Sequence, residues 1–330
     1  ILSENFSILL VTLITYCTIL YIKNSNPKQI KILTVLQLVA ILTKPFFLLL
    51  PFATAFLILS KRLISGGKSL LSHVKLLLPG LITIYLGVIG YSLVNLAQNG
   101  YFGVSTVGNV NYFGKILQYD MYDLGDNDML KDQIEYAINN EYPEYIVNNS
   151  FLEPWHFVVK YGWNKEHYRD ISEFSKKIML SHPFTYTGKS LALTYELFTS
   201  SPFTDFIADA ALIEAGRPNS IMIKIRKLTD KFDNLYFLLV PALLESVLCI
   251  PVTIRRKKTC STSFLPVIMA IILYHYLISA FFSYGDYGRL LVPSYTLIYT
   301  VICLYIYRIL CLPAALIKRM AFIFKSKQYN

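Results

Sequence analysis

Charged residues are scarce in this chain. Only 16% of its 330 residues are charged, whereas 54% are hydrophobic, and the mean hydropathy is +0.46. Such a composition leaves too little polar surface to cover a water-soluble globule of this length. It excludes an ordinary soluble protein and predicts a chain that lies in a lipid bilayer.

Cysteine is also sparse, and its placement argues against disulfides. The five cysteines lie in apolar stretches or beside basic clusters, and none lies between residues 98 and 232. No pair of them has the CxxC spacing. We therefore expect no structural disulfide and no cysteine metal site.

Several familiar catalytic signatures are missing from the sequence. It contains no GxSxG, P-loop, GxGxxG or HExxH pattern, so nothing supports a hydrolase, nucleotidase, dehydrogenase or zinc protease. Basic residues interleaved with aromatic ones, as in nucleic-acid-binding segments, are also missing. We expect no nucleic-acid partner.

Long apolar stretches dominate the sequence. Five of them approach or exceed the roughly 20 residues that cross a hydrocarbon core as a helix; they are residues 5–22, 76–97, 233–254, 263–284 and 290–311. Residues 27–60 are also apolar, apart from Lys28, Lys31 and a central Lys44-Pro45. Because a proline disfavours helical backbone in the residue before it, this stretch forms either a hairpin of two short spans or one long kinked helix.

The distribution of charge favours the hairpin. Residues 98–232 hold 17 of the 21 acids but 13 of the 31 Lys and Arg residues, whereas basic clusters flank residues 27–60 on both sides. Cytosolic loops are rich in Lys and Arg, so both flanks are expected in the cytosol and the chain must cross twice between them. This predicts seven spans, with Lys44 at the outer tip of the hairpin.

The same pattern gives the domain organisation and the localisation. We expect an α-helical polytopic protein of the plasma (inner) membrane: membrane helices in residues 1–97, an extracytosolic domain in 98–232, and three membrane helices with a basic cytosolic tail in 233–330. The external domain is expected to be mixed α/β or mainly α.

Local patterns within the external domain differ along its length. Residues 103–114 are turn-rich and extended in character. Residues 168–180 have the spacing of an amphipathic helix, which His182-Pro183 should end before a second helix that reaches about Thr199.

In the N-terminal membrane part, Asn26-Pro27 has the form of a helix start, with Asn as the cap and Pro in the first turn.

Two cations lie on the side where cations are disfavoured. Of the 31 Lys and Arg residues, 18 lie outside residues 98–232 (31 minus 13), and 16 of these are in or beside proposed cytosolic segments. The other two are Lys44 and Arg289. Each is either an interfacial anchor or part of a phosphate site, and Arg289 could also pair with Asp286, three residues earlier.

Two further groups of residues could contact ligands. Trp155 and Trp163 could stack on a sugar or acceptor ring, although packing is the alternative. The acidic residues from Asp120 to Glu135 could bind a divalent metal, but they lack the spacing of a known cation loop, and a solvated acidic surface is the favoured interpretation.

Four segments together resemble one enzyme family. They are LSENFS (2–7), AILTKPFF (40–47), SKKIMLSHPFTY (175–186) and YGDYGRLLVP (284–293). In this order they look like the C-terminal part of a GT-C glycosyltransferase that uses a polyprenyl-phosphate sugar, of the protein O-mannosyltransferase and lipid A aminoarabinose transferase type.

The resemblance implies transfer of a sugar from a polyprenyl-phosphate donor to a protein, lipid or glycan acceptor on the outer side of the membrane. It implies Lys44 and Arg289 as ligands of the donor phosphate, with Asp286 and Tyr287 as neighbours. It requires no particular cofactor and is compatible with a divalent metal. The catalytic carboxylate of such enzymes follows their first span, and here it is expected upstream of Ile1.

Two other functions remain open on the sequence. A flippase or transporter of lipid-linked sugars would also need a polyprenyl-phosphate site, but its spans would be expected to carry more ionisable residues than Glu245. A non-catalytic membrane scaffold would use the external domain to bind a partner.

Overall fold

The protein is helical wherever its structure is described. The computed structural model describes residues 2–64, 70–105, 107–126, 128–136, 168–199, 235–256, 264–284 and 290–327. These ranges contain helices and turns and no β-strand. The α-helical class predicted for the membrane part is confirmed, and the described part of residues 98–232 favours the mainly α option.

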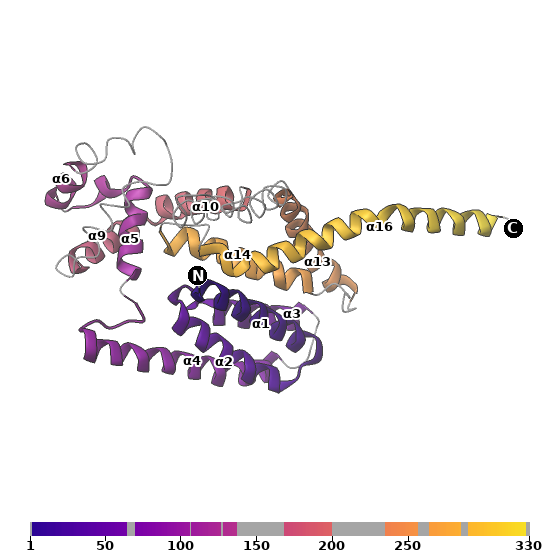
Figure 1. Cartoon of the computed structure of the whole chain (residues 1–330), viewed down its shortest axis with the longest axis horizontal. Coiled ribbons are helices and arrows are strands. Elements are labelled where there is room, and N and C mark those ends of the chain that lie inside the picture. Colours follow the sequence, from indigo (N-terminus) through magenta and orange to yellow (C-terminus); the bar gives the residue numbers. More distant parts are fainter. Residues whose placement is uncertain are drawn as a thin grey trace, which may run out of the picture.

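The N-terminal helices lie side by side in Figure 1, coloured indigo to purple. They are α1 (Leu2–Asn24), α2 (Pro27–Thr43), the short 3-10 helix η1 (Pro45–Phe47), α3 (Leu50–Ile64) and α4 (Leu70–Asn99). The predicted helix start is present, because the Asn26 side chain accepts a hydrogen bond from the Lys28 backbone N–H at 3.0 Å and Pro27 occupies the first turn.

Residues 27–64 form a hairpin. Gln37 Nε2 on α2 donates a hydrogen bond to Thr54 Oγ1 on α3 at 2.6 Å, and both side chains are buried. In one continuous helix these two residues would lie about 25 Å apart along the axis. The kinked-helix alternative is therefore excluded.

The end of α3 returns to the end of α1. The Arg62 guanidinium donates to the carbonyls of Tyr21 at 3.4 Å and Ile22 at 3.1 Å, and to the Ser25 hydroxyl. The last carbonyls of a helix have no partner within the helix, so Arg62 caps α1. Ser25 has a left-handed backbone, with φ 55°, at this end.

Helix α4 starts at the same end as Arg62 and runs parallel to α2. His73 Nδ1, in the first turns of α4, lies 2.6 Å from the Tyr21 hydroxyl. Further along, Gly87 faces Leu38 so closely that a β-carbon there would lie 3.0 Å from it. The termini of α1 to α4 therefore form two sets, one near Arg62 and the other near Lys44.

Helix α14 lies at the centre of the C-terminal helices. They are η5 (Tyr236–Leu238), α13 (Leu239–Arg256), α14 (Phe264–Phe282), η6 (Val292–Ser294) and α16 (Tyr295–Lys327). Helix α14 contacts α1, α3, α5, α10, α13 and α16, and most of its side chains are buried. The segment after residue 311, predicted as a tail, continues α16 as a helix to Lys327. In Figure 1 this end of α16 projects beyond the other helices.

The remaining described helices belong to residues 98–232. They are α5 (Val107–Gln118), η2 (Tyr122–Leu124), α6 (Asp128–Tyr136), α9 (Tyr168–Ser181) and α10 (Pro183–Thr199). The two helices predicted on either side of His182-Pro183 are confirmed as α9 and α10. Figure 1 places α5, α6 and α9 beyond one end of the membrane helices, with α10 beside α14.

The extended character predicted for residues 103–114 is wrong, because α5 begins at Val107. Its apolar residues Val110, Phe113 and Leu117 are buried on one face at helical spacing. Burial of this face outweighs the poor helix propensity of Gly108 and Gly114.

Among the described residues, five helical segments are long and apolar enough to cross a membrane; they are Glu4–Asn24, Pro45–Leu63, Leu70–Asn99, Phe264–Phe282 and Val292–Cys311. This supports a membrane-embedded protein. Helix α2 has 17 residues, which is near the short limit for a span. The total of seven spans stays a prediction.

Candidate functional site

Lys44 occupies the break between the two arms of the hairpin. Its backbone is extended, with φ −143° and ψ 117°, as expected for a residue before proline. Its N–H donates to the Ala40 carbonyl at 2.8 Å, and its carbonyl accepts from Phe47 N at 3.0 Å. Lys44 therefore ends α2 and starts η1, and this fixes its position.

The Lys44 side chain forms an ion pair with Glu4. Lys44 Nζ lies 3.4 Å from Glu4 Oε1, and the two side chains are 18% and 5% exposed. Glu4 belongs to the first turn of α1, where a carboxylate interacts favourably with the helix dipole. The pair is largely withdrawn from water, so its electrostatic interaction is stronger than that of a surface pair.

Aromatic side chains fix the turn after Lys44 against α14. Phe46 stacks on His275 with ring centroids 5.6 Å apart, and Phe47 packs edge-on against the same ring at 5.8 Å. The Tyr274 hydroxyl donates to the Phe46 carbonyl at 3.1 Å. His275 is buried and its Nδ1 lies 2.8 Å from the Ile271 carbonyl, so it is a hydrogen-bonded core residue.

Two tyrosines from residues 98–232 cap the end of α14. The Tyr119 hydroxyl donates to the Ala280 carbonyl at 2.8 Å, and the Tyr186 hydroxyl donates to the Phe281 carbonyl. Burial raises the pKa of Tyr119 to about 12 and also raises the pKa of Tyr186, so both hydroxyls stay protonated donors near neutral pH. These bonds join the segment after α5, and α10, to the helix that packs against Phe46.

A buried lysine lies beside these tyrosines. Lys115 on α5 is fully buried, and its Nζ donates to Gln118 Oε1 at 3.1 Å. The ammonium lies 5.2 Å from the centroid of the Tyr119 ring. Burial lowers the pKa of Lys115 to about 6. The sequence analysis gave no sign of this residue, because one Lys in a glycine-containing helix resembles any surface lysine.

The other residues predicted for the site lie outside the described ranges. Arg289, Asp286 and Tyr287 fall between α14 and η6, and Trp155 and Trp163 fall between α6 and α9. Their roles stay predictions, and Lys44 is the predicted site residue with a described position.

Acidic side chains do not gather into a metal site in the part of the chain that is described, where no group of three or more His, Cys, Asp or Glu residues could hold an ion. Asp120, Asp123, Asp126, Asp132 and Glu135 are exposed, and Asp126 pairs with Lys177. These acidic side chains therefore lie on the surface.

Glu4 is the site residue that the sequence analysis missed. One signal was available: Glu4 is an isolated acid at the start of an apolar stretch, at the end opposite Lys23. The antiparallel course of α1 and α2 then brings Glu4 to Lys44.

Comparisons with known proteins give no relative for this chain. No family model matches it, and neither a curated protein nor a solved structure is detectably similar.

Proposed function

We propose that the protein is a membrane glycosyltransferase that moves a sugar from a polyprenyl-phosphate donor to an acceptor at the membrane face that carries residues 98–232. The observation that carries the proposal is the position of Lys44. It is a cation in a helix break at the end of the apolar segments, paired with Glu4 and backed by α14.

The chemistry of the donor explains why a cation is needed there. When a sugar leaves a polyprenyl phosphate, negative charge develops on the phosphate, and fixed positive charge stabilises that transition state. An ammonium group has three N–H donors, so a lysine can contact a carboxylate and a phosphate together. Glu4 would hold Lys44 in place while the donor is absent.

The proposed orientation follows from charge. The end of α1 to α4 that carries Arg62 also carries the exposed Lys23, Lys28, Lys31 and Lys75. Positive residues are retained on the cytosolic side, so Lys44 and residues 98–232 would face outward from a plasma (inner) membrane. A protein, lipid or glycan acceptor would meet the donor there, close to α5 and α10.

A binding experiment tests the Lys44 assignment directly. The full-length protein is titrated with undecaprenyl phosphate and, separately, with undecaprenol, which lacks the phosphate, and binding is followed by native mass spectrometry. We expect the phosphate form to bind about tenfold more tightly, as a charge-assisted contact would give. Lys44→Gln combined with Glu4→Gln should remove most of that preference.

Two variants make the result specific. Glu4→Gln alone should keep or strengthen the preference, because it leaves the cation and removes a competing anion. Lys31→Gln changes an exposed lysine at the other end of α2 and should have no effect. An unchanged preference in the double variant would show that Lys44 does not bind the phosphate.

A transport assay separates the enzyme from its alternative. Proteoliposomes that contain the full-length protein and radiolabelled polyprenyl-phosphate mannose are supplied with membrane extract as the source of acceptor. Transfer of label to acceptor supports the transferase. Movement of the donor between leaflets without transfer would instead identify a flippase.

A further inference from the structure

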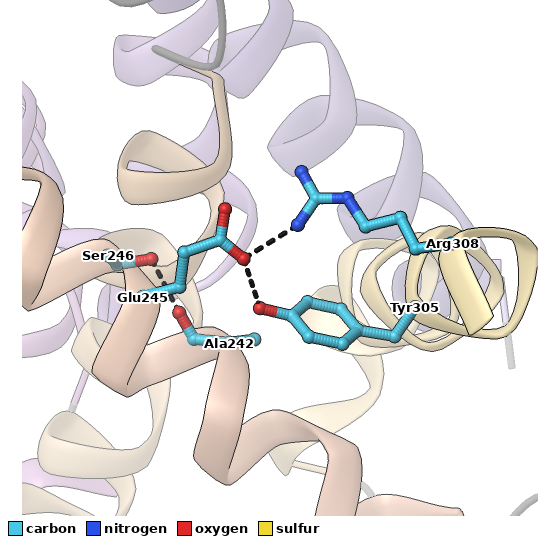
Figure 2. A network of polar contacts seen from close by, with 5 residues as sticks. All are labelled: Ala242, Glu245, Ser246, Tyr305 and Arg308. Carbon is cyan, nitrogen blue, oxygen red and sulfur yellow. Dashed lines mark hydrogen bonds and ion pairs between the residues drawn. The ribbon is translucent and has the colours of Figure 1, made fainter. Parts of the chain in front are cut away.

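A charged pair joins α13 and α16 within their apolar segments. Glu245 Oε2 accepts a hydrogen bond from Arg308 Nη1 at 2.6 Å and another from the Tyr305 hydroxyl. The Arg308 guanidinium lies 5.3 Å from the centroid of the Tyr305 ring. Figure 2 shows both contacts meeting at the same carboxylate oxygen.

The pair opens to the outside of the helix bundle. The Arg308 and Glu245 side chains are 33% and 32% exposed. Their neighbours Leu310 on α16 and Leu244 and Leu248 on α13 are exposed and apolar, so this surface faces lipid chains. Ionisable side chains in such a surface are costly, and their presence points to a role.

Arg308 lies close to one boundary of the membrane. The apolar segment that starts at Val292 reaches Arg308 after 16 residues, about 24 Å along a helix, whereas the hydrocarbon core is about 30 Å thick. A long arginine side chain reaches the headgroup layer from that depth. In Figure 1, α16 runs away from the end of the bundle where α1 begins. Glu4 in the first turn of α1 pairs with Lys44, so Arg308 is toward the face opposite Lys44.

The guanidinium has the geometry of a phosphate ligand. It carries five N–H donors in a planar fork, and one of its terminal nitrogens is bound to Glu245. In Figure 2 the other terminal nitrogen points away from the carboxylate. The contacts with Glu245 and Tyr305 hold the fork in one orientation, which lowers the entropy cost of binding an anion.

The surrounding charge favours an anion at this face. Lys23, Lys28, Lys31 and Lys75 are exposed at the same end of the helices. The other acids among the described residues are Glu4, at the opposite end, and those between residues 120 and 196. The local field therefore attracts anionic headgroups.

We propose that Arg308, held by Glu245 and Tyr305, binds the phosphate of an anionic phospholipid at the membrane face opposite Lys44. The site is independent of the proposed transferase activity. A lipid fits better than a second copy of the chain, because a protein partner would have to bring an anion into an apolar surface and lose its hydration.

Native mass spectrometry tests the lipid site. The full-length protein in detergent is titrated with phosphatidylglycerol and with phosphatidylcholine as the reference lipid. Glu245→Gln combined with Arg308→Gln removes both charges and leaves amides that can still bond across the helices. We expect the tightest phosphatidylglycerol binding to weaken about fivefold or more, with phosphatidylcholine unaffected.

Further variants and a competition experiment distinguish the lipid site from other sources of binding. Arg308→Lys keeps the charge and should weaken binding less, and Lys176→Gln, at an exposed position on α9, should leave the tightest binding unchanged. Glycerol phosphate in solution should not compete; equal competition would assign the site to free phosphate. Unchanged phosphatidylglycerol binding in the double variant would overturn the proposal. If the variant also lost the mass peak of a protein dimer, the charged pair would instead join two copies of the chain.

Discussion

Burial and charge oppose each other at Lys115. An ammonium over the Tyr119 ring gains about 1 kcal/mol from the ring's electrostatic field. Desolvation of a fully buried ammonium costs several times more, and the pKa of Lys115 falls to about 6 as a result. At neutral pH this lysine is therefore mostly an uncharged donor to Gln118.

The low pKa of Lys115 gives the protein a pH-dependent stability. In the unfolded chain a lysine has a pKa near 10.4, so between about pH 6 and pH 10 the unfolded state binds more protons than the folded state. The free energy of unfolding should rise with pH across this window. Lys115→Met should raise the thermal midpoint at pH 7 and make its increase from pH 7 to pH 9.5 smaller.

Lys176→Met is the matched control for this effect. Lys176 is exposed on α9, which packs against α5, so its substitution should change neither the thermal midpoint nor the pH dependence of that midpoint. Thermal unfolding of the purified protein, followed by tryptophan fluorescence at several pH values, measures both. Equal pH slopes for Lys115→Met and the wild type would contradict a buried neutral lysine.

The sequence located Lys44 but could not supply its partner. Lys44 stands out because a cation follows an apolar stretch on the side where cations are rare. Glu4 acts through a contact across 40 positions, which depends on the antiparallel packing of α1 and α2. Local patterns do not encode that packing.

At the scale of elements, α5 depends on a close approach that glycine permits. A β-carbon at Gly114 would lie 2.3 Å from the Tyr284 ring. Gly114→Ala should therefore shift α5 away from the residues that follow α14 and destabilise the protein by about 1–3 kcal/mol. Thermal unfolding measures the loss.

Gly108 provides the comparison within the same helix. A β-carbon there would meet nothing within 4 Å, so Gly108→Ala should be neutral or slightly stabilising. Equal destabilisation by both substitutions would mean that α5 needs glycine for flexibility rather than for the contact with Tyr284.

Helices α9 and α10 were predictable and α5 was not, for a physical reason. The apolar residues Ile171, Phe174 and Ile178 mark one face of α9, and Pro183 fixes the start of α10. In α5 the two glycines and the surrounding polar residues hide a similar apolar face. The contacts that make α5 a helix come from α9 and α14, which are distant in sequence.

At the scale of the whole molecule, the helix ends separate by charge. Lys23, Lys28 and Arg62 lie at one end of the N-terminal helices, and α5, α6 and α9 lie beyond the other. Charge counting in the sequence predicts that the basic end faces the cytosol, and this orientation stays a prediction. The number of spans is less accessible, since α2 is near the shortest length that crosses a membrane.

Cysteine labelling tests the orientation. In a variant whose native cysteines are replaced by serine, Asn99→Cys and Lys28→Cys place exposed thiols at opposite ends of the helices. A membrane-impermeant maleimide should label Asn99→Cys in intact cells, and Lys28→Cys only after the cells are permeabilised. The reverse pattern would place residues 98–232 in the cytosol.

The shortness of α2 has a consequence for the surrounding bilayer. Its 17 residues span about 25 Å, whereas the hydrocarbon core is about 30 Å thick. A span shorter than the core draws the nearby lipid inward, at a modest cost per ångström of mismatch. We expect the membrane to be locally thinner above Lys44. The headgroup of a long-chain lipid would then lie closer to the Lys44 ammonium without a movement of the protein.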